Sequence, residues 1–275
     1  LARAMPRQLV MFLAERHGLT VVEAQVPWPL PNAQALVDAY AQALAGGARI
    51  AIFDHIFSPL AVITPIEQLI PLCRAQGTQV LIDGAHAPAL LPLDLDALAR
   101  LGVDWYAGNC HKWLCAHEGV GVLYASPEGQ RDLHPTVISN YYGNGFAAEF
   151  AWTGTGDPSA RLAVPVAIDF IEALGVERYR AALRCGMRDA AACIAKDWNV
   201  PPGAPLEMCG AMVSFPLPVA EAATPESVAR WRLKFLQQYQ AEAPLFAING
   251  RLWMRVSAQV YNELSDVEVL AGVFG

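Results

Sequence analysis

Two short stretches of the sequence carry the side chains that are able to do chemistry. Asp83-Gly84-Ala85-His86 directly follows the apolar run QVLI, and Asn109-Cys110-His111-Lys112 follows a second predicted strand. Ligands of open α/β sheets bind at such strand ends. A lysine and a carboxylate at neighbouring strand ends suit pyridoxal phosphate: the lysine forms a Schiff base with the aldehyde, and the carboxylate keeps the pyridine nitrogen protonated. An apolar surrounding would lower the pKa of such a lysine, as a nucleophile requires.

Other interpretations of the same residues stay open. Asp-Gly is common in turns, so Asp83 could be a turn residue only, and Lys112 could be a surface lysine on an ordinary loop. Cys110, His111, Cys115 and His117 follow the pattern C-H-x3-C-x-H, which suggests zinc. Structural zinc sites usually pair C-x2–4-C with a second, distant pair, so this irregular spacing argues against a metal, and we expect none.

Composition limits the class of protein. The chain has 275 residues, of which 54% are hydrophobic and 16% charged, which is typical of a globular protein with a large core. Its net charge of −7 is spread along the chain and argues against nucleic-acid binding. The apolar runs are too short to span a membrane. Six irregularly spaced cysteines indicate reduced thiols, and with no visible signal peptide they predict a cytoplasmic location.

Strand and helix signals alternate along the chain, which predicts an α/β fold with a mostly parallel sheet covered by helices. A large domain is expected over residues 1–160 and a smaller C-terminal α+β domain over 161–275. The expected strands are 19–25, 49–53, 79–82, 105–107, 121–125, 211–215 and 252–256. The expected helices are one ending at Gly18, 32–45, one from Thr64 to Gly77, 94–101, 157–175, 176–198, 225–241 and 266–274.

Three motifs in this order resemble a known family. DGAHAP, GNCHKWL and the stretch MRVSAQVYNE (residues 254–263) are similar to the class V aminotransferase family of fold-type I pyridoxal-phosphate enzymes. The resemblance is closest to the isopenicillin N epimerase-like branch, which is related to cysteine desulfurases. It covers nearly the whole chain and implies an enzyme acting on an amino acid, a homodimer, and the fold-type I transferase-like architecture.

The resemblance also implies a role for each matching residue. Lys112 would be the Schiff-base lysine, and Asp83 would pair with the pyridine nitrogen. His86 matches the residue within reach of the cofactor's phenolic oxygen, and His111 would touch the phosphate. His86 alone could also be a helix cap.

Three further residues match family positions in other parts of the chain. Ser58 falls where desulfurase relatives carry an asparagine near the same phenolic oxygen. Thr155 resembles a threonine that reaches the phosphate of the neighbouring subunit. Arg255 matches the arginine that binds the substrate α-carboxylate, a role that suits the guanidinium fork, although Arg251 is a competing candidate.

Two departures from the family bear on function. The family usually carries an additional N-terminal segment that stacks on the cofactor ring and supplies a helix N-terminus for its phosphate, so we expect this chain to be N-terminally incomplete. The stretch 243–250 (APLFAING) lacks the cysteine of desulfurases, which argues against persulfide formation. Epimerisation, transamination and β-elimination such as carbon–sulfur cleavage remain, all beginning with removal of the Cα proton by Lys112. The alternative is an inactive homologue that serves as a binding or structural subunit.

Overall fold

The structure, a computed structural model that describes residues 5–274, contains two compact units. Unit 1 takes its described residues from Leu1–Gly46, Phe57–Pro65 and Glu177–Gly275, and unit 2 comprises Gly47–Ile56 and Ile66–Val176. The division into domains 1–160 and 161–275 has other bounds than these units, and it stays a prediction.

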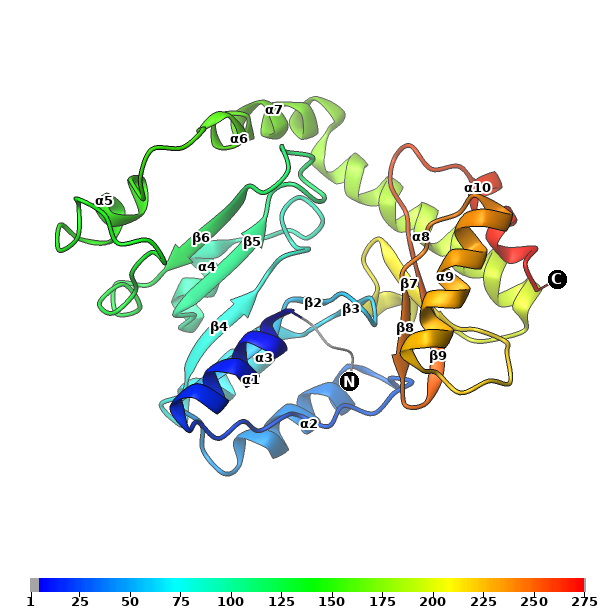
Figure 1. The fold of residues 1–275 in the computed structure, drawn as a ribbon, viewed down its shortest axis with the longest axis horizontal. Helices are drawn as coiled ribbons and strands as arrows, with labels where there is room; N and C mark the ends of the chain where they lie inside the picture. Colours follow the sequence, from blue (N-terminus) through cyan, green and yellow to red (C-terminus); the bar gives the residue numbers. More distant parts are fainter. Residues whose placement is uncertain (1–4, 275) are drawn as a thin grey trace. The chain divides into compact units, whose positions relative to one another are not determined.

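Unit 2 is built on a four-stranded sheet in the order β1-β4-β5-β6. The strands β4, β5 and β6 are labelled in Figure 1. The strands β1, β4 and β5 are parallel, and β6 runs antiparallel to β5. All four expected strands are present, and the predicted α/β architecture with a mostly parallel sheet is confirmed. Their bounds are Ile50–Asp54 for β1, Gln79–Asp83 for β4, Trp105–Asn109 for β5 and Gly121–Ala125 for β6.

One face of this sheet is buried by strict alternation along the strands. Phe53, Val80, Ile82 and Tyr106 point to the same side and are at most 1% exposed, as expected of the inward face of a sheet. The helix α3 (Ile66–Arg74) contacts β4 and the helix α4 (Leu95–Leu101). The Asp94 side chain accepts the N–H of Ala97 at 2.8 Å at the start of α4 and so caps this helix.

The prediction of one continuous helix over residues 157–175 is wrong. The chain forms two helices instead, α6 (Ser159–Leu162) and α7 (Val164–Leu174), which follow a short helix α5 (Phe146–Ala151). Pro165 explains the interruption because proline has no backbone N–H to donate to the carbonyl of Arg161 one turn earlier.

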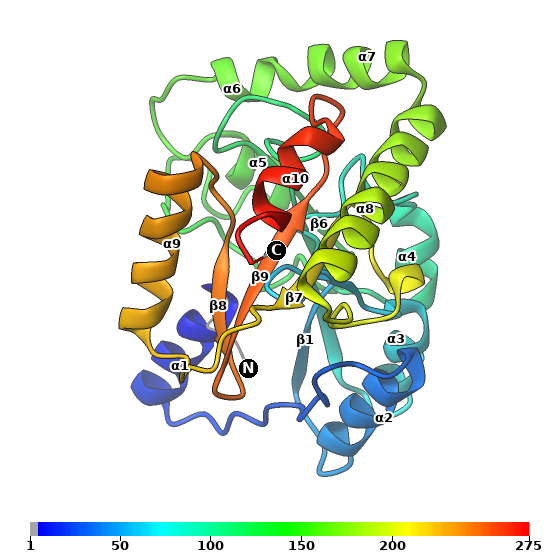
Figure 2. The ribbon, with the colours of Figure 1, turned by 90° about the vertical axis from the view of Figure 1, so that its right-hand side faces the viewer.

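Unit 1 contains an antiparallel sheet in the order β7-β9-β8, drawn in yellow to orange in Figure 2. Its strands are Met212–Pro216 (β7), Leu245–Ile248 (β8) and Arg251–Ser257 (β9). The helix α9 (Pro225–Tyr239) contacts β8 and the helix α10 (Leu264–Ala271). A small two-stranded sheet pairs β2 (Ile56–Phe57) with β3 (Val62–Ile63). The helices are α1 (Met5–His17), α2 (Ala33–Leu44), α8 (Val176–Trp198), α9 (Pro225–Tyr239) and α10 (Leu264–Ala271), with a 3-10 turn at Leu206–Met208.

Two features of unit 1 differ from the expectation. Residues 19–25 form no strand, and Leu19 and Val22 are 56% and 63% exposed. Within residues 5–274 no strand lies alongside to accept their backbone groups, and an extended segment becomes a strand only by pairing. The strand β8 was not expected because its four apolar residues lie in APLFAING, where Pro244 and Gly250 are typical of a loop.

Gly84 directly after β4 tests the packing that holds the strand end. A Cβ on Gly84 would lie 2.2 Å from the hydroxyl oxygen of Tyr106, which is fully buried and hydrogen-bonded to His55 at 2.8 Å. We expect Gly84→Ala to lower the free energy of unfolding by about 1–3 kcal/mol, measured by urea denaturation. Gly156→Ala is the matched control because a Cβ there meets nothing within 4 Å. Equal stability of the two variants would contradict this packing.

Candidate active site

The candidate site of unit 2 lies at the ends of neighbouring strands. Asp54 ends β1 and stands in register with Asp83, which ends β4, and Asp83 is in register with Ala107 of β5. Lys112 lies in the connection between β5 and β6. Register partners on parallel strands point to the same face and lie roughly 5 Å apart, so this sheet edge gathers two carboxyl groups.

Lys112 and His86, both predicted from the sequence, are in direct contact. The Lys112 Nζ lies 3.1 Å from Nε2 of His86. The other ring nitrogen of His86, Nδ1, accepts a hydrogen bond from the indole N–H of Trp113 at 3.2 Å. Trp113 is buried, and the sequence reading did not assign it a role. The position of Trp113 directly after Lys112 in HKWL is the sequence signal that could have indicated a role at the site.

Asp83 is half-buried, and its Oδ1 accepts the backbone N–H of Ala85 at 2.9 Å. Asp54, which the sequence reading missed, is half-buried as well. Burial, and then the charge of Asp83, raise the pKa of the Asp54 carboxyl to about 7. Two carboxyl groups side by side do not both ionise easily, so Asp54 holds a proton over a wide pH range.

His55 and Tyr106 form a buried hydrogen bond behind these carboxyls. His55 Nδ1 lies 2.8 Å from the Tyr106 hydroxyl. Burial lowers the pKa of His55 to about 4 and raises the pKa of Tyr106, with the charges of Asp83 and Glu67 adding to the latter. The burial of His55 beside Asp54 agrees with a structural role.

His111 and Thr155 have different surroundings. His111 donates from Nδ1 to the carbonyl of Val120 at 3.1 Å, so its Nε2 is the ring nitrogen that remains for an anion. Binding of a phosphate there needs a proton on that nitrogen. Thr155 is exposed on the segment between α5 and α6. The phosphate roles of both residues stay predictions.

Unit 1 brings together the two other predicted residues. The Arg255 guanidinium donates from one terminal nitrogen to the Ser58 hydroxyl at 2.5 Å and to the Ser58 carbonyl at 3.1 Å. Arg255 Nε is buried and has no hydrogen-bond partner among the described residues. Burial also lowers the pKa of Arg255. A buried guanidinium with an unsatisfied N–H suits a carboxylate ligand, whereas the competing Arg251 is exposed.

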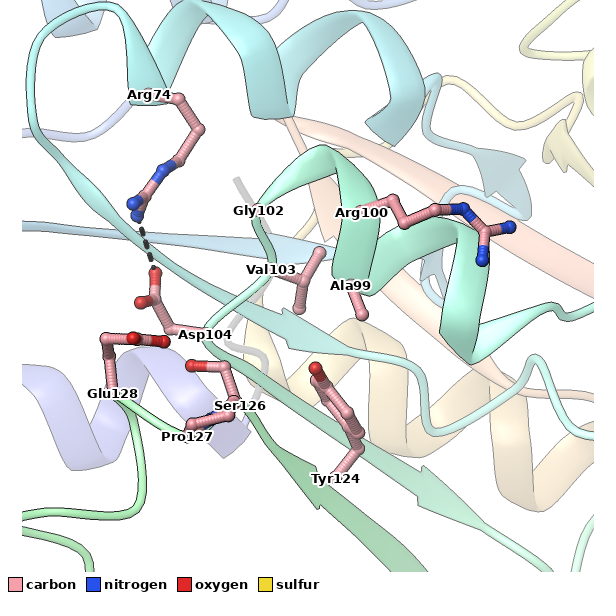
Figure 3. Close-up of a pocket in the computed structure, with 10 residues that line it drawn as sticks. All are labelled: Arg74, Ala99, Arg100, Gly102, Val103, Asp104, Tyr124, Ser126, Pro127 and Glu128. Carbon is pink, nitrogen blue, oxygen red and sulfur yellow. Dashed lines mark hydrogen bonds and ion pairs between the residues drawn. The ribbon is translucent and has the colours of Figure 1, made fainter.

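A pocket of about 360 Å³ lies at the opposite edge of the unit 2 sheet (Figure 3). Asp104, just before β5, and Ser126, just after β6, contribute to its lining. One charged pair of its lining is satisfied internally, since Asp104 pairs with Arg74 at 3.2 Å and accepts the N–H of Val80 at 2.7 Å. None of the predicted site residues lines this pocket.

Comparison with known proteins identifies the family. Residues 8–187 match the family model described as Aminotransferase class-V. The chain belongs to the class V aminotransferase family. The predicted membership is thus confirmed, and with it pyridoxal phosphate as the family's cofactor.

Named relatives cover nearly the whole chain. This chain is 33% identical over 274 residues to a probable chloroplastic L-cysteine desulfhydrase of Arabidopsis thaliana, and the match covers 91% of this chain and 57% of that protein. It is 34% identical over 280 residues to the isopenicillin N epimerase of Streptomyces clavuligerus, covering 94% and 68% respectively. The chain therefore spans little more than half the length of the plant relative.

Solved structures show the same fold. A cystine C–S lyase in complex with its reaction product cysteine persulfide superposes with a TM-score of 0.76 at 20% identity, covering 98% of this chain and 72% of that one. A cysteine desulfurase from Thermococcus onnurineus gives a TM-score of 0.73 at 21% identity, covering 99% and 70%. The fold-type I architecture expected from the sequence is confirmed.

No described helix has the length and apolar character to cross a membrane. No three His, Cys, Asp or Glu side chains among residues 5–274 gather as metal ligands would.

The carboxyl pair predicts a pH-dependent stability. The pKa of Asp54 is about 7 in the folded chain and near 3.9 when unfolded, so the stability contributed by the protonated form is lost as pH rises from about 4 to about 7. The side chain in Asp54→Asn does not ionise, so this variant should keep that stability. The difference in free energy of unfolding between Asp54→Asn and the wild type should therefore grow in favour of the variant between these pH values. It should reach about 2 kcal/mol, allowing for partial solvent screening, and then level off.

Chemical denaturation at a series of pH values measures this difference. Asp132→Asn removes an exposed carboxylate of the same unit and serves as control, with a difference from wild type that stays small and flat. A flat difference for Asp54→Asn as well would show that Asp54 ionises like an ordinary carboxyl group.

Proposed function

We propose that this protein is a pyridoxal-phosphate enzyme that removes the Cα proton of an amino acid, with Lys112 as both the attachment point of the cofactor and the base. The observation that carries the proposal is the contact of Lys112 Nζ with His86 Nε2 at 3.1 Å, at the sheet edge where Asp83 ends β4. The family membership of the chain supports it.

The donor set fits the cofactor. Lys112 offers an amine for the aldehyde, and Asp83 has a second carboxylate oxygen besides the one bonded to Ala85. A carboxylate there can accept the N–H of a protonated pyridine ring. When bound, pyridoxal phosphate supplies an electron sink for the carbanion at Cα. His111 and Thr155 are proposed for its phosphate and Ser58 for the region of its phenolic oxygen.

The protein's own residues then have separate tasks. Arg255 binds the substrate α-carboxylate, because its buried Nε needs an acceptor. This contact fixes the direction of the Cα–H bond. Lys112 takes the proton from Cα, and His86 orients the Lys112 amine through Nε2. Asp83 holds a negative charge at the ring nitrogen.

We propose carbon–sulfur β-elimination as the reaction. The similarity to proteins named L-cysteine desulfhydrase, at 33% identity in Arabidopsis thaliana and in Oryza sativa, supports it. The stretch 243–250 contains no cysteine, which argues for release of the sulfur-containing leaving group rather than a protein-bound persulfide. Epimerisation is the second candidate because of the 34% identity to isopenicillin N epimerase.

Assembly and location are proposed as well. Exposed apolar side chains of unit 2, including Tyr142, Leu162 and Val166, at 62–71% exposure, support a homodimer. A cytoplasmic location is proposed from the six free cysteines.

Attachment of the cofactor to Lys112 is tested by reduction. Borohydride treatment of protein loaded with pyridoxal phosphate should abolish the visible absorbance and leave a pyridoxyl group on Lys112, found by peptide mass spectrometry. The chain has only two other lysines, Lys196 and Lys234. Lys112→Ala should lose the label and Lys196→Ala should keep it. A label on Lys196 or Lys234 refutes the assignment, and absence of any label favours the inactive homologue.

The reaction class is tested with cysteine in heavy water. β-Elimination should give sulfide and pyruvate in equal amounts, whereas epimerisation should give the opposite enantiomer with deuterium at Cα and no keto acid. Arg255→Ala should raise KM by about 10- to 100-fold, as expected for loss of a charge-assisted hydrogen bond, while Arg251→Ala changes little. Formation of the opposite enantiomer without pyruvate would overturn the assignment of β-elimination. If no amino acid of a broad panel exchanges its Cα hydrogen, both β-elimination and epimerisation are overturned.

A further inference from the structure

Three side chains of unit 2 form a chain of hydrogen bonds that ends at the lysine. The Trp113 indole N–H donates to His86 Nδ1 at 3.2 Å, and His86 Nε2 lies 3.1 Å from Lys112 Nζ. An indole nitrogen donates only. Trp113 is 7% exposed, so its N–H depends on a protein partner.

Counting protons along this chain fixes the form of each group. Because Nδ1 of His86 accepts, it carries no proton, and the neutral imidazole has its single proton on Nε2. The Nε2–H then donates to Lys112 Nζ, which must offer a lone pair. An ammonium group has none. An ammonium donor would instead require a His86 ring without a proton on either nitrogen, an anion that does not form near neutral pH.

The orientation of the His86 ring is fixed by the same contacts. Turning the ring over would place carbon atoms opposite both Trp113 Nε1 and Lys112 Nζ, so both hydrogen bonds would be lost together. The local backbone holds the two partners in place: Lys112 and Trp113 are consecutive, and the Lys112 carbonyl accepts the N–H of Cys115 at 3.2 Å.

We propose that Trp113 is a positioning residue that fixes the His86 tautomer and thereby holds Lys112 as a neutral amine in the cofactor-free chain. The inference rests on the proposed function in one respect only, the use of that amine to attack the cofactor's aldehyde. A neutral amine is the nucleophilic form of lysine, so the hydrogen-bond chain prepares the residue before the cofactor arrives.

Charged groups at the same sheet edge act in the opposite direction. Asp83 and, once ionised, Asp54 lie at neighbouring strand ends, and negative charge favours an ammonium over an amine. The other titratable side chains in the connection between β5 and β6 are Cys110, His111, Cys115, His117 and Glu118. His111 is bonded to the Val120 carbonyl, and Cys115, His117 and Glu118 are exposed. The hydrogen bonds from His86 and Trp113 outweigh the effect of these carboxylates on Lys112.

The experiment uses the full chain without cofactor. Trace labelling of the three lysines with acetic anhydride, quantified by mass spectrometry over a pH series, gives the pH at which each amine becomes reactive. Lys112 should reach half-reactivity at least about one pH unit below the exposed Lys196, its internal reference. In Trp113→Phe, which keeps a ring but removes the N–H, the Lys112 midpoint should rise by about one unit towards that of Lys196.

A second readout reports the tautomer of His86 directly. The ¹⁵N spectrum of the histidines should show His86 of the wild type with its proton on Nε2, and the Nδ1-protonated form should appear in Trp113→Phe. Trp105→Phe is the matched control, because it removes another indole hydrogen bond of unit 2, to the Gly129 carbonyl at 2.8 Å. It should change neither readout.

The outcomes separate the two proposals. A wild-type His86 protonated on Nδ1, or a Lys112 midpoint equal to that of Lys196 or unmoved by Trp113→Phe, overturns the role of Trp113 whether or not the cofactor binds. Pyridoxyl labelling away from Lys112 overturns the cofactor assignment and leaves the tautomer measurement standing.

Discussion

The parallel register of β1, β4 and β5 is the constraint on which the candidate site depends. Strands that run side by side in one direction end at one edge, and the chain puts polar residues directly after each apolar run: Asp54, Asp83 and the stretch that leads to Lys112. The buried face of the same strands, with Phe53 and Ile82, fixes which way the carboxyl groups point. A one-residue slip of β4 would turn Asp83 to the other face. The strand register that packs the core therefore also sets the geometry of the site.

This edge also concentrates groups that cannot all be charged. Asp54 and Asp83 stand in register, and His55 and Tyr106 are buried beside them. Each group is held in the form that its surroundings allow: Asp54 keeps a proton up to about pH 7, and His55 stays neutral down to about pH 4. Asp83 accepts the Ala85 N–H through Oδ1 and has a second carboxylate oxygen for a ligand. A single carboxylate is what a protonated pyridine nitrogen requires.

The sequence predicted this arrangement where local signals sufficed. Short apolar runs placed the four strands of unit 2, and the helix expected over 94–101 is α4, which Asp94 and Gly102 cap. Asp83, His86 and Lys112 were found because each follows a strand or belongs to a motif. Asp54 and Trp113 were missed, since their roles come from contacts with residues distant in the chain. Residues 19–25 have strand composition but lack a partner, and pairing is a property of the fold rather than of the segment.

The two edges of the unit 2 sheet differ in how their polar groups are satisfied, and this difference separates a reactive site from a structural one. At the pocket edge, opposite charges pair: Arg74 with Asp104, whose carboxylate also caps the Val80 N–H. Such pairing leaves little affinity for a further polar ligand. At the other edge, Asp54 stands beside Asp83 and keeps a proton up to about pH 7. The hydrogen bond with His86 holds Lys112 as an amine, so this edge offers the amine and the carboxylate that covalent chemistry at Cα requires.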